Sequence, residues 1–351
     1  MYILNDLLQN TIEIGASDLH LTVGVPPTVR LNGKLSSIGE EILEPTDIER
    51  FAREILEEDY DKYLEEGEID TSYSMAGIGR FRVNIFKQRN SDAIALRVIA
   101  LKILTLDELK HPNVLKDIVQ KQRGLILVTG PTGSGKSTTL AAMINEINNT
   151  RQAHIITLED PIEYLHKHNK CIVNQREIGK DSKSYKNALK AILREDPDVI
   201  FVGEMRDLET ISVAITAAET GHLVLSTLHT IGAAKTIDRI IDVFPPHQQQ
   251  QIKIQLSSVL QGVISQQLIE TADKKGRVSA LEIMVTTPAI QNLIREGKTH
   301  QIESAVQTGS KYGMKTMDMA IAELYKKGFI SLENAMASSV DKETLRRLIM
   351  L

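Results

Sequence analysis

The spacing of apolar and polar residues changes part-way along the chain. Up to residue 100, some stretches repeat apolar residues at helical spacing, and others alternate apolar with polar residues as half-buried strands do. From Gly124 onward, short unbroken apolar runs alternate with helical stretches. Because unbroken runs are typical of strands buried on both faces, this second part predicts a mostly parallel sheet covered by helices.

The first part predicts a small α+β domain over residues 1–100. Its expected elements are a helix ending near Gly15, a strand at 19–23, a hairpin around Asn32-Gly33, an amphipathic helix carrying Ile48, Phe51, Ile55 and Leu56, and strands at 80–86 and 93–99. Residues 101–121 lose the strand alternation and contain His111-Pro112, which suits a linker with a leading helix. We therefore place the domain boundary in this segment.

The second part predicts an α/β domain over residues 122–351. Its expected strands are Leu125–Thr129, Ile155–Leu158, Val199–Val202 and Leu223–Ser226. The final hundred residues are expected to be largely helical. The fold class predicted for the whole chain is α/β, with an α+β N-terminal domain, a core of sheet and helices, and a helical C-terminal region.

Composition excludes several classes of protein. Hydrophobic residues make up 42% of the 351 residues, which is incompatible with a mainly disordered chain. No stretch reaches the ~18 apolar residues of a spanning helix, and the start lacks the features of a signal peptide, so we expect a cytoplasmic protein. The single cysteine, Cys171, precludes an internal disulfide and a cysteine-rich zinc site. Aromatic residues make up 4%, without tryptophan, which argues against base stacking.

The net charge of -5 conceals an uneven distribution. Between Glu40 and Asp70 there are fourteen acidic and three basic residues, which leaves 38 Lys and Arg against 32 Asp and Glu, or +6, elsewhere. We interpret the acidic segment as an amphipathic helix with a solvated acidic face. Neither part has the strongly basic balance of a nucleic-acid-binding protein, so no direct nucleic-acid partner is expected.

The most specific motif runs from Gly130 to Ser137, where GPTGSGKS matches G-x-x-x-x-G-K-[ST] in full. It follows a predicted strand and begins a predicted helix, which disfavours a purely structural glycine turn. Glycines let backbone N–H groups converge on phosphate oxygens, Lys136 supplies positive charge, and the Ser137 hydroxyl can bind Mg²⁺. The expected phosphate contacts are Thr132, Gly133, Ser134, Gly135, Lys136, Ser137 and Thr138.

Acidic residues follow two other predicted strands. Glu204 comes directly after Gly203, a position where many such proteins carry a Mg²⁺-binding aspartate, so Glu204 is the candidate to orient or deprotonate an attacking water. Glu159, Asp160 and Glu163 cluster at another strand end, where carboxylates can hold Mg²⁺ through water or steady the nucleophile. A strand cap and a solvated turn are the respective alternatives.

Two histidines bracket the predicted strand at 223–226. Beside a nucleotide site, His222 and His229 suggest sensing of the γ-phosphate, with His229 the better candidate, and a structural role is equally open. Metal binding by these histidines is not expected, because no third ligand lies at suitable spacing.

Two arginines of the first domain are expected to face each other. Side-chain alternation directs Arg82 and Arg97 away from the apolar face, and a hairpin centred on Arg89-Asn90 pairs residues whose numbers sum to 179. Like charges in a cross-strand pair are destabilising, so we infer an anion between them, such as a triphosphate bound to another subunit. Two separately solvated arginines in another register are the alternative.

Four motifs in sequence order, GPTGSGKST, LEDPIEY, PDVIFVGEMRD and TGHLVLSTLHT, resemble the Walker A, Asp, atypical Walker B and His boxes of the secretion and pilus ATPases. ASDLHLTVGVPPTVRLNG and RFRVN resemble the retraction ATPases of type IV pili within this superfamily. The resemblance implies a PAS-like N-terminal domain and a RecA-like core, binding of ATP or ADP with Mg²⁺, and a homohexameric ring. It further implies peripheral association with the cytoplasmic face of the membrane machinery, through an inner-membrane platform protein that acts on pilin.

Carried over residue by residue, the resemblance assigns roles to the candidates. Lys136 and Ser137 would bind phosphate and Mg²⁺, Glu204 would be the catalytic base, and His229 would sense the γ-phosphate. Asp160 and Glu163 would support the metal ion and the water. Arg82 and Arg97 would be arginine fingers. The retraction signature A-I-R-N-L-I-R-E appears as AIQNLIRE, with Gln291 in place of an arginine. Its apolar residues Ile290, Leu293 and Ile294 also suit simple core packing.

Other functions remain as alternatives. Pilus assembly and type II secretion ATPases typically carry a longer N-terminal region and a tetracysteine zinc motif, neither of which matches this chain. A nucleic-acid motor on the same core is disfavoured by the few aromatic residues. A non-hydrolysing regulatory module is disfavoured by Glu204, Glu163 and the paired arginines.

Overall fold

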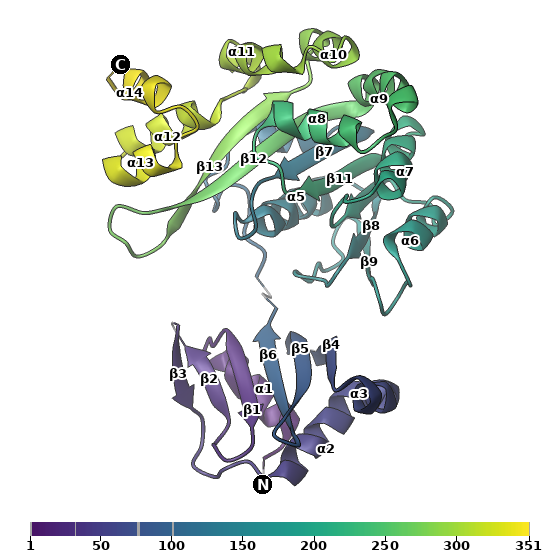
Figure 1. Ribbon diagram of the computed structural model, residues 1–351, viewed down its shortest axis with the longest axis vertical. Coiled ribbons are helices and arrows are strands. Elements are labelled where there is room, and N and C mark those ends of the chain that lie inside the picture. Colours follow the sequence, from purple (N-terminus) through teal and green to yellow (C-terminus); the bar gives the residue numbers. More distant parts are fainter. Residues whose placement is uncertain (1, 32, 76–77, 100–101, 351) are drawn as a thin grey trace. The chain divides into compact units, whose positions relative to one another are not determined.

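The computed structural model describes residues 2–31, 33–75, 78–99 and 102–350 (Figure 1). The chain forms two compact units. The N-terminal unit comprises residues 1–102 together with Glu163–Leu165, and the C-terminal unit comprises the remainder from Ile103 onward.

The N-terminal unit is a six-stranded antiparallel sheet with helices packed against it (Figure 1). Its elements are α1 (Leu4–Glu13), β1 (Asp18–Thr22), β2 (Thr28–Leu31), β3 (Lys34–Ser37), α2 (Pro45–Leu56), α3 (Tyr60–Glu66), β4 (Glu68–Met75), β5 (Gly79–Gln88) and β6 (Ser91–Val98). The strand order is β3-β2-β1-β6-β5-β4. One face buries apolar residues of α1 and α2, and the other face of β1, β6 and β5 carries polar and charged side chains.

Most of the elements predicted for this unit are confirmed. Helix α2 begins with a proline in its first turn and a capping box between Glu44 and Asp47. It buries the predicted apolar stripe, while Glu49 and Glu54 are exposed and Asp47 is partly buried. The hairpin of β2 and β3 is present, although its Asn32 lies outside the described residues. Strand β4 was not predicted, because most of its residues are polar and only partly buried.

The C-terminal unit is built on a seven-stranded mixed sheet. Its elements are α4 (Val114–Val119), β7 (Gly124–Thr129), α5 (Lys136–Thr150), β8 (His154–Glu159), β9 (Ile172–Glu177), α6 (Tyr185–Ile192), β10 (Val199–Val202), α7 (Leu208–Glu219), β11 (Leu223–Leu228), α8 (Ala233–Asp242), α9 (Pro246–Val259), β12 (Leu260–Glu270), β13 (Arg277–Val285), α10 (Pro288–Arg295), α11 (Ile302–Gln307), α12 (Met317–Lys326), α13 (Leu332–Ser338) and α14 (Lys342–Met350). The strand order is β13-β12-β7-β11-β10-β8-β9, and only the β12–β13 pair is antiparallel.

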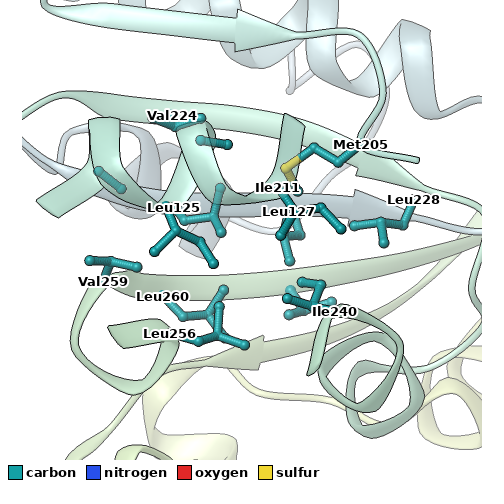
Figure 2. Packing of buried hydrophobic residues seen from close by; sticks show 14 of the residues in the cluster. Leu125, Leu127, Met205, Ile211, Val224, Leu228, Ile240, Leu256, Val259 and Leu260 are labelled. Atoms are coloured by element: carbon teal, nitrogen blue, oxygen red, sulfur yellow. The ribbon is translucent and has the colours of Figure 1, made fainter. Parts of the chain in front are cut away.

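Helices cover both faces of this sheet, as the unbroken apolar runs predict. Leu125 and Leu127 of β7 point into a core closed by α7, α8 and α9, which Figure 2 shows from close by. Ile126 and Val128 point the other way, into a core closed by α4 and α5. All six residues of β7 are buried, so this central strand can hold the segments at its two ends in fixed positions.

The last hundred residues are helical only in part, and the prediction of a largely helical region is wrong for residues 260–285. These residues form β12 and β13, which extend the sheet beside β7. The rest of the region is helical, and Ile290 and Ile294 of α10 are fully buried, which confirms core packing for the apolar residues around Gln291. Among the described helices, none is long and apolar enough to cross a membrane.

Candidate nucleotide site

The segment Gly130–Ser137, called the phosphate loop below, connects β7 to α5. Gly130, Gly133 and Gly135 have φ angles of 142°, 78° and 86°, a region that favours glycine, and this backbone lets N–H groups converge on an anion. The Lys136 Nζ donates to the carbonyl oxygens of Gly130 at 2.8 Å and Pro131 at 3.0 Å. Its ammonium group is thereby kept at the loop.

The remaining residues predicted for phosphate binding lie on the same loop or on the first turn of α5. Thr132 and Gly133 are exposed, Ser134 is buried, and Gly135, Ser137 and Thr138 are partly buried. Helix α5 begins at Lys136, so the positive end of its dipole lies at the loop and favours phosphate. These features fit a nucleotide polyphosphate.

A magnesium ion is compatible with the donors near the loop. Among the described residues, no group of three His, Cys, Asp or Glu side chains forms a metal cage. Mg²⁺ in nucleotide sites is usually held by one or two protein oxygens together with phosphate oxygens and water. Ser137 at the start of α5 provides a hydroxyl oxygen of that kind.

Glu204 and His229 are brought together at the ends of adjacent strands. Glu204 follows β10, and its Oε2 lies 3.6 Å from the Nε2 of His229, which follows β11. Its Oε1 lies 2.6 Å from the Nε of Arg206, a partner that the sequence analysis did not name. The strand ends are fixed by a hydrogen bond from the Thr227 hydroxyl to the Gly203 carbonyl at 2.6 Å. Because β7, β11 and β10 are neighbours, their carboxyl ends place the phosphate loop, His229 and Glu204 along one edge.

The acidic cluster at the end of β8 divides into side chains with different surroundings. The Glu159 carboxylate is buried and accepts hydrogen bonds from Thr157 Oγ1 at 2.6 Å and Gln175 Nε2 at 3.1 Å. Asp160 is exposed at the strand tip. Glu163 belongs to the segment Glu163–Leu165 of the N-terminal unit.

Tyr185 is a further residue of this edge that the sequence analysis missed. Burial raises the pKa of its hydroxyl, and the nearby carboxylates of Asp160, Glu204 and Glu159 add to the effect. A Cβ atom at Gly203 would lie 3.0 Å from this hydroxyl. The tyrosine hydroxyl therefore lies close against Gly203 and leaves little room for a side chain there, a contact that depends on how α6 packs.

His222 has the structural role that the sequence analysis left open. Its Nδ1 lies 2.9 Å from the carbonyl oxygen of Ala217, which caps the end of α7. It precedes β11 while His229 follows it, so the two histidines lie at opposite ends of the strand.

Arg82 and Arg97 are directly opposite each other on β5 and β6, which confirms the predicted register. Both are exposed on the polar face of the sheet. The Arg97 Nε donates to Asp18 Oδ1 at 2.8 Å, and Asp18 on β1 is directly opposite Arg97. Burial alone would raise the pKa of Asp18, but the Ser17 hydroxyl and Arg97 together hold it below its usual value.

This contact corrects one step of the sequence argument. The sequence pattern led us to expect an anion between Arg82 and Arg97 that relieves their repulsion, such as a triphosphate bound to another subunit. The Asp18 carboxylate already supplies a negative charge beside Arg97 from the neighbouring strand. The arginine pair therefore does not by itself require a phosphate.

Residues 2–337 match the family described as type II/IV secretion system protein. The chain belongs to this family. A Pseudomonas aeruginosa member described as the type IV pilus retraction ATPase PilT is 51% identical over 333 residues, which cover 95% of this chain and 96% of that protein. A Neisseria gonorrhoeae twitching motility protein is 47% identical over 91% of this chain and 86% of its own length.

The fold of this type II/IV secretion family member is also similar to that of solved structures. A crystal structure of the pilus retraction motor PilT with bound ADP is 48% identical, covers 99% of this chain and 100% of its own, and superposes with a TM-score of 0.92. The α/β fold class and the resemblance to retraction ATPases are confirmed.

Proposed function

We propose that this chain is the ATP-hydrolysing motor that powers retraction of type IV pili. The observation that carries hydrolysis is the alignment of the phosphate loop, His229 and Glu204 at the ends of three adjacent strands. The pilus as target is supported by nearly full-length similarity to proteins described as retraction and twitching motors.

ATP is the proposed substrate, and ADP and phosphate are the proposed products. The backbone N–H groups of the phosphate loop and Lys136 would bind the β- and γ-phosphates. Mg²⁺, when bound, neutralises charge on the phosphates, with Ser137 as its proposed ligand and Asp160 and Glu163 acting through water.

Glu204 is the proposed general base for the attacking water. Its carboxylate is partly buried at a strand tip and contacts both Arg206 and His229, so its orientation is fixed from two sides. His229 is proposed to sense the γ-phosphate, because it contacts the base and its ring can donate a hydrogen bond to a phosphate oxygen.

Arg82 and Arg97 are the proposed arginine fingers. A guanidinium group delivered to the transferring phosphoryl stabilises developing negative charge, and in related systems this contributes about 10³–10⁵ in rate. Arg97 would have to exchange its contact with Asp18 for a contact with phosphate. Arg97 is the exposed partner of this pair and Asp18 the buried one. After such an exchange the Asp18 carboxylate would keep its hydrogen bond from the Ser17 hydroxyl and its neighbour Arg30.

The working assembly is proposed to be a homohexamer that associates peripherally with the cytoplasmic face of the membrane machinery. Its partner would be an inner-membrane platform protein and, through that protein, pilin. Closure of the N-terminal unit on a nucleotide site, followed by its release after hydrolysis, would supply the mechanical step.

Hydrolysis is tested by measuring phosphate release from ATP with the purified full-length chain. Glu204→Gln is expected to lower turnover by at least about 10² while leaving ADP binding in place, because the base acts only on the water. Glu209→Gln is the matched control, since Glu209 is exposed on α7 and pairs with Lys186. Equal turnover of Glu204→Gln and the wild type would contradict the assignment of the base.

The cellular role is tested by deleting the gene and counting surface pili. Extra, immobile pili that disappear on complementation with the wild type, but not with Glu204→Gln, are expected of a retraction motor. Bald cells would instead indicate a pilus assembly ATPase. Stimulation of turnover by DNA would indicate a nucleic-acid motor.

A further inference from the structure

The phosphate loop is held by a side chain that lies outside its motif. Gln266 is on β12, directly after Ser265, which pairs with Thr129 at the end of β7. Its side chain is almost fully buried. Its Nε2 donates to the carbonyl oxygen of Ser134 at 2.8 Å, and its Oε1 accepts from the Thr139 hydroxyl at 2.7 Å. One amide thus joins the middle of the loop to the first turn of α5.

The packing around Gln266 leaves no space between it and the loop. A Cβ atom at Gly130 would lie 2.3 Å from the backbone carbonyl oxygen of Gln266, and one at Gly135 would lie 2.8 Å from the side-chain Nε2 of Gln266. Both glycines therefore serve the contact with β12 in addition to their backbone conformation. The loop is thus packed closely against the backbone and the side chain of Gln266.

The hydrogen-bonded chain extends to the segment that leads into the C-terminal unit. His111 is buried, and its Nε2 lies 3.0 Å from the Thr139 hydroxyl oxygen. Because that hydroxyl gives its hydrogen to Gln266, it can only accept from His111, so His111 Nε2 carries a proton. Each of the three hydrogen bonds that connect His111, Thr139, Gln266 and the Ser134 carbonyl then joins a donor to an acceptor.

We propose that Gln266 is a positioning residue for nucleotide phosphates, and that Thr139 and His111 fix its orientation. The peptide unit between Ser134 and Gly135 is planar and trans, so its C=O and N–H groups point in opposite directions. By holding the Ser134 carbonyl toward β12, Gln266 directs the Gly135 N–H into the loop, where a phosphate oxygen would accept from it.

The inference rests on the proposed binding of nucleotide at this loop and adds to it a determinant that no phosphate-loop motif includes. Through the side chains of Thr139 and Gln266, His111 in the segment before α4 is also connected to the phosphate loop. Removing the Gln266 amide would leave the fold and the glycines in place but free the peptide unit at Ser134 to rotate. Weaker binding of phosphate is the consequence.

The test uses the full-length chain and calorimetric titration with ADP. Gln266→Met keeps the length of the side chain and removes both hydrogen bonds, so we expect the Kd for ADP to rise about tenfold. Thr139→Val removes the hydroxyl and should also raise the Kd for ADP. Thr139→Ser keeps the hydroxyl and should have the Kd of the wild type. Gln267→Met is the matched control, because Gln267 is the next residue of the strand and points to its opposite face.

Thermal unfolding without nucleotide separates positioning from simple destabilisation. A folded Gln266→Met whose Kd for ADP equals that of the wild type would overturn the proposal. If Gln266→Met does not fold, equal Kd values for Thr139→Val and Thr139→Ser would overturn it instead. A wild-type chain that binds no ADP would contradict the proposed function itself, so the two failures are distinguishable.

Discussion

Arg97 forms an ion pair with Asp18 and is also a proposed arginine finger. Its replacement by alanine distinguishes an effect on nucleotide binding from an effect on turnover. Arg97→Ala should lower ATP turnover by about 10³ or more, because charge developing on the phosphoryl group would lose its guanidinium partner. The Kd for ADP should stay within about threefold of the wild type, since the phosphate loop is intact. Phosphate release and calorimetric titration measure the two effects.

Arg30 offers a matched control for Arg97 on the same row of the sheet. It is opposite Asp18 on the other side, and its Nε lies 3.9 Å from Asp18 Oδ2. Arg30→Ala removes the same charge from the same face but is not expected to change turnover. Equal loss of turnover in both variants would point to the charge of the sheet face rather than to a finger at Arg97.

His111 should make the stability of the protein depend on pH in a defined window. Burial lowers the pKa of His111 from its ordinary 6.5 to about 4. Between these values the unfolded chain binds a proton that the folded chain does not, so the free energy of unfolding falls as the pH drops from 6.5 toward 4 and is fully present above 6.5. Between pH 7 and pH 5 the loss due to this residue is about 2 kcal/mol.

Denaturant unfolding of His111→Asn at the two pH values measures this contribution. The variant should lose about 2 kcal/mol less than the wild type on going from pH 7 to pH 5. Charged neighbours do not change the comparison, because Lys110, Lys315, Lys327 and Glu323, which line the adjacent cavity, are present in both proteins. An identical pH dependence in His111→Asn and the wild type would contradict the assignment.

The parts of the site that could be predicted from the sequence are those formed by residues close together in the chain. The phosphate loop needs its glycines and lysine at fixed spacing, and the Arg82–Arg97 register follows from a two-residue turn. Gln266, Tyr185 and Asp18 could not be found in this way. Each acts through a strand or helix that is distant in sequence, so its contact depends on the order of strands in the sheet and on how the helices pack.

Helix α7 shows how a local element supports the candidate base. It begins after Asp207, whose Oδ1 accepts from the Thr210 N–H at 2.8 Å and whose Oδ2 accepts from the Thr210 hydroxyl at 3.1 Å. Asp207→Ala should lower the free energy of unfolding by about 1 kcal/mol, since the first turn loses its cap. Asp207→Asn, which can still accept from the backbone, should retain most of the stability. Denaturant midpoints of the two variants measure the difference, and equal midpoints would show that the cap contributes nothing.

Helices and strands could be predicted from the sequence where their side chains are buried on one face or on all faces. The fully buried β7, β10 and β11 appear as unbroken apolar runs, and α2 appears as an apolar stripe. Strand β12 is equally buried over most of its length, but it directly continues α9 and contains three glutamines and one serine, so no change of pattern marks where the helix ends. The burial of its Gln266 and Ser265 is explained by polar contacts that become visible only in three dimensions.

At the scale of the whole molecule, the two units are organised around separate apolar cores. The core of the N-terminal unit draws its residues from positions 4–96, whereas the cores of the C-terminal unit begin at Leu106. A unit with a hydrophobic core of its own is expected to be able to fold alone. The proposed fingers lie in the first unit, and the phosphate loop, Glu204 and His229 lie in the second.

A chain consisting of residues 103–351 should therefore bind nucleotide without hydrolysing it efficiently. We expect its Kd for ADP to stay within about threefold of the full-length value, because the phosphate loop and Gln266 are present. Its turnover should fall by about 10³ or more, as for Arg97→Ala, because the fingers are missing. Introducing Arg97→Ala into the full chain and comparing it with the fragment shows whether loss of the unit costs more than loss of its arginine. A fragment that hydrolyses ATP at the full-length rate would remove the N-terminal unit, and both arginines with it, from the catalytic mechanism.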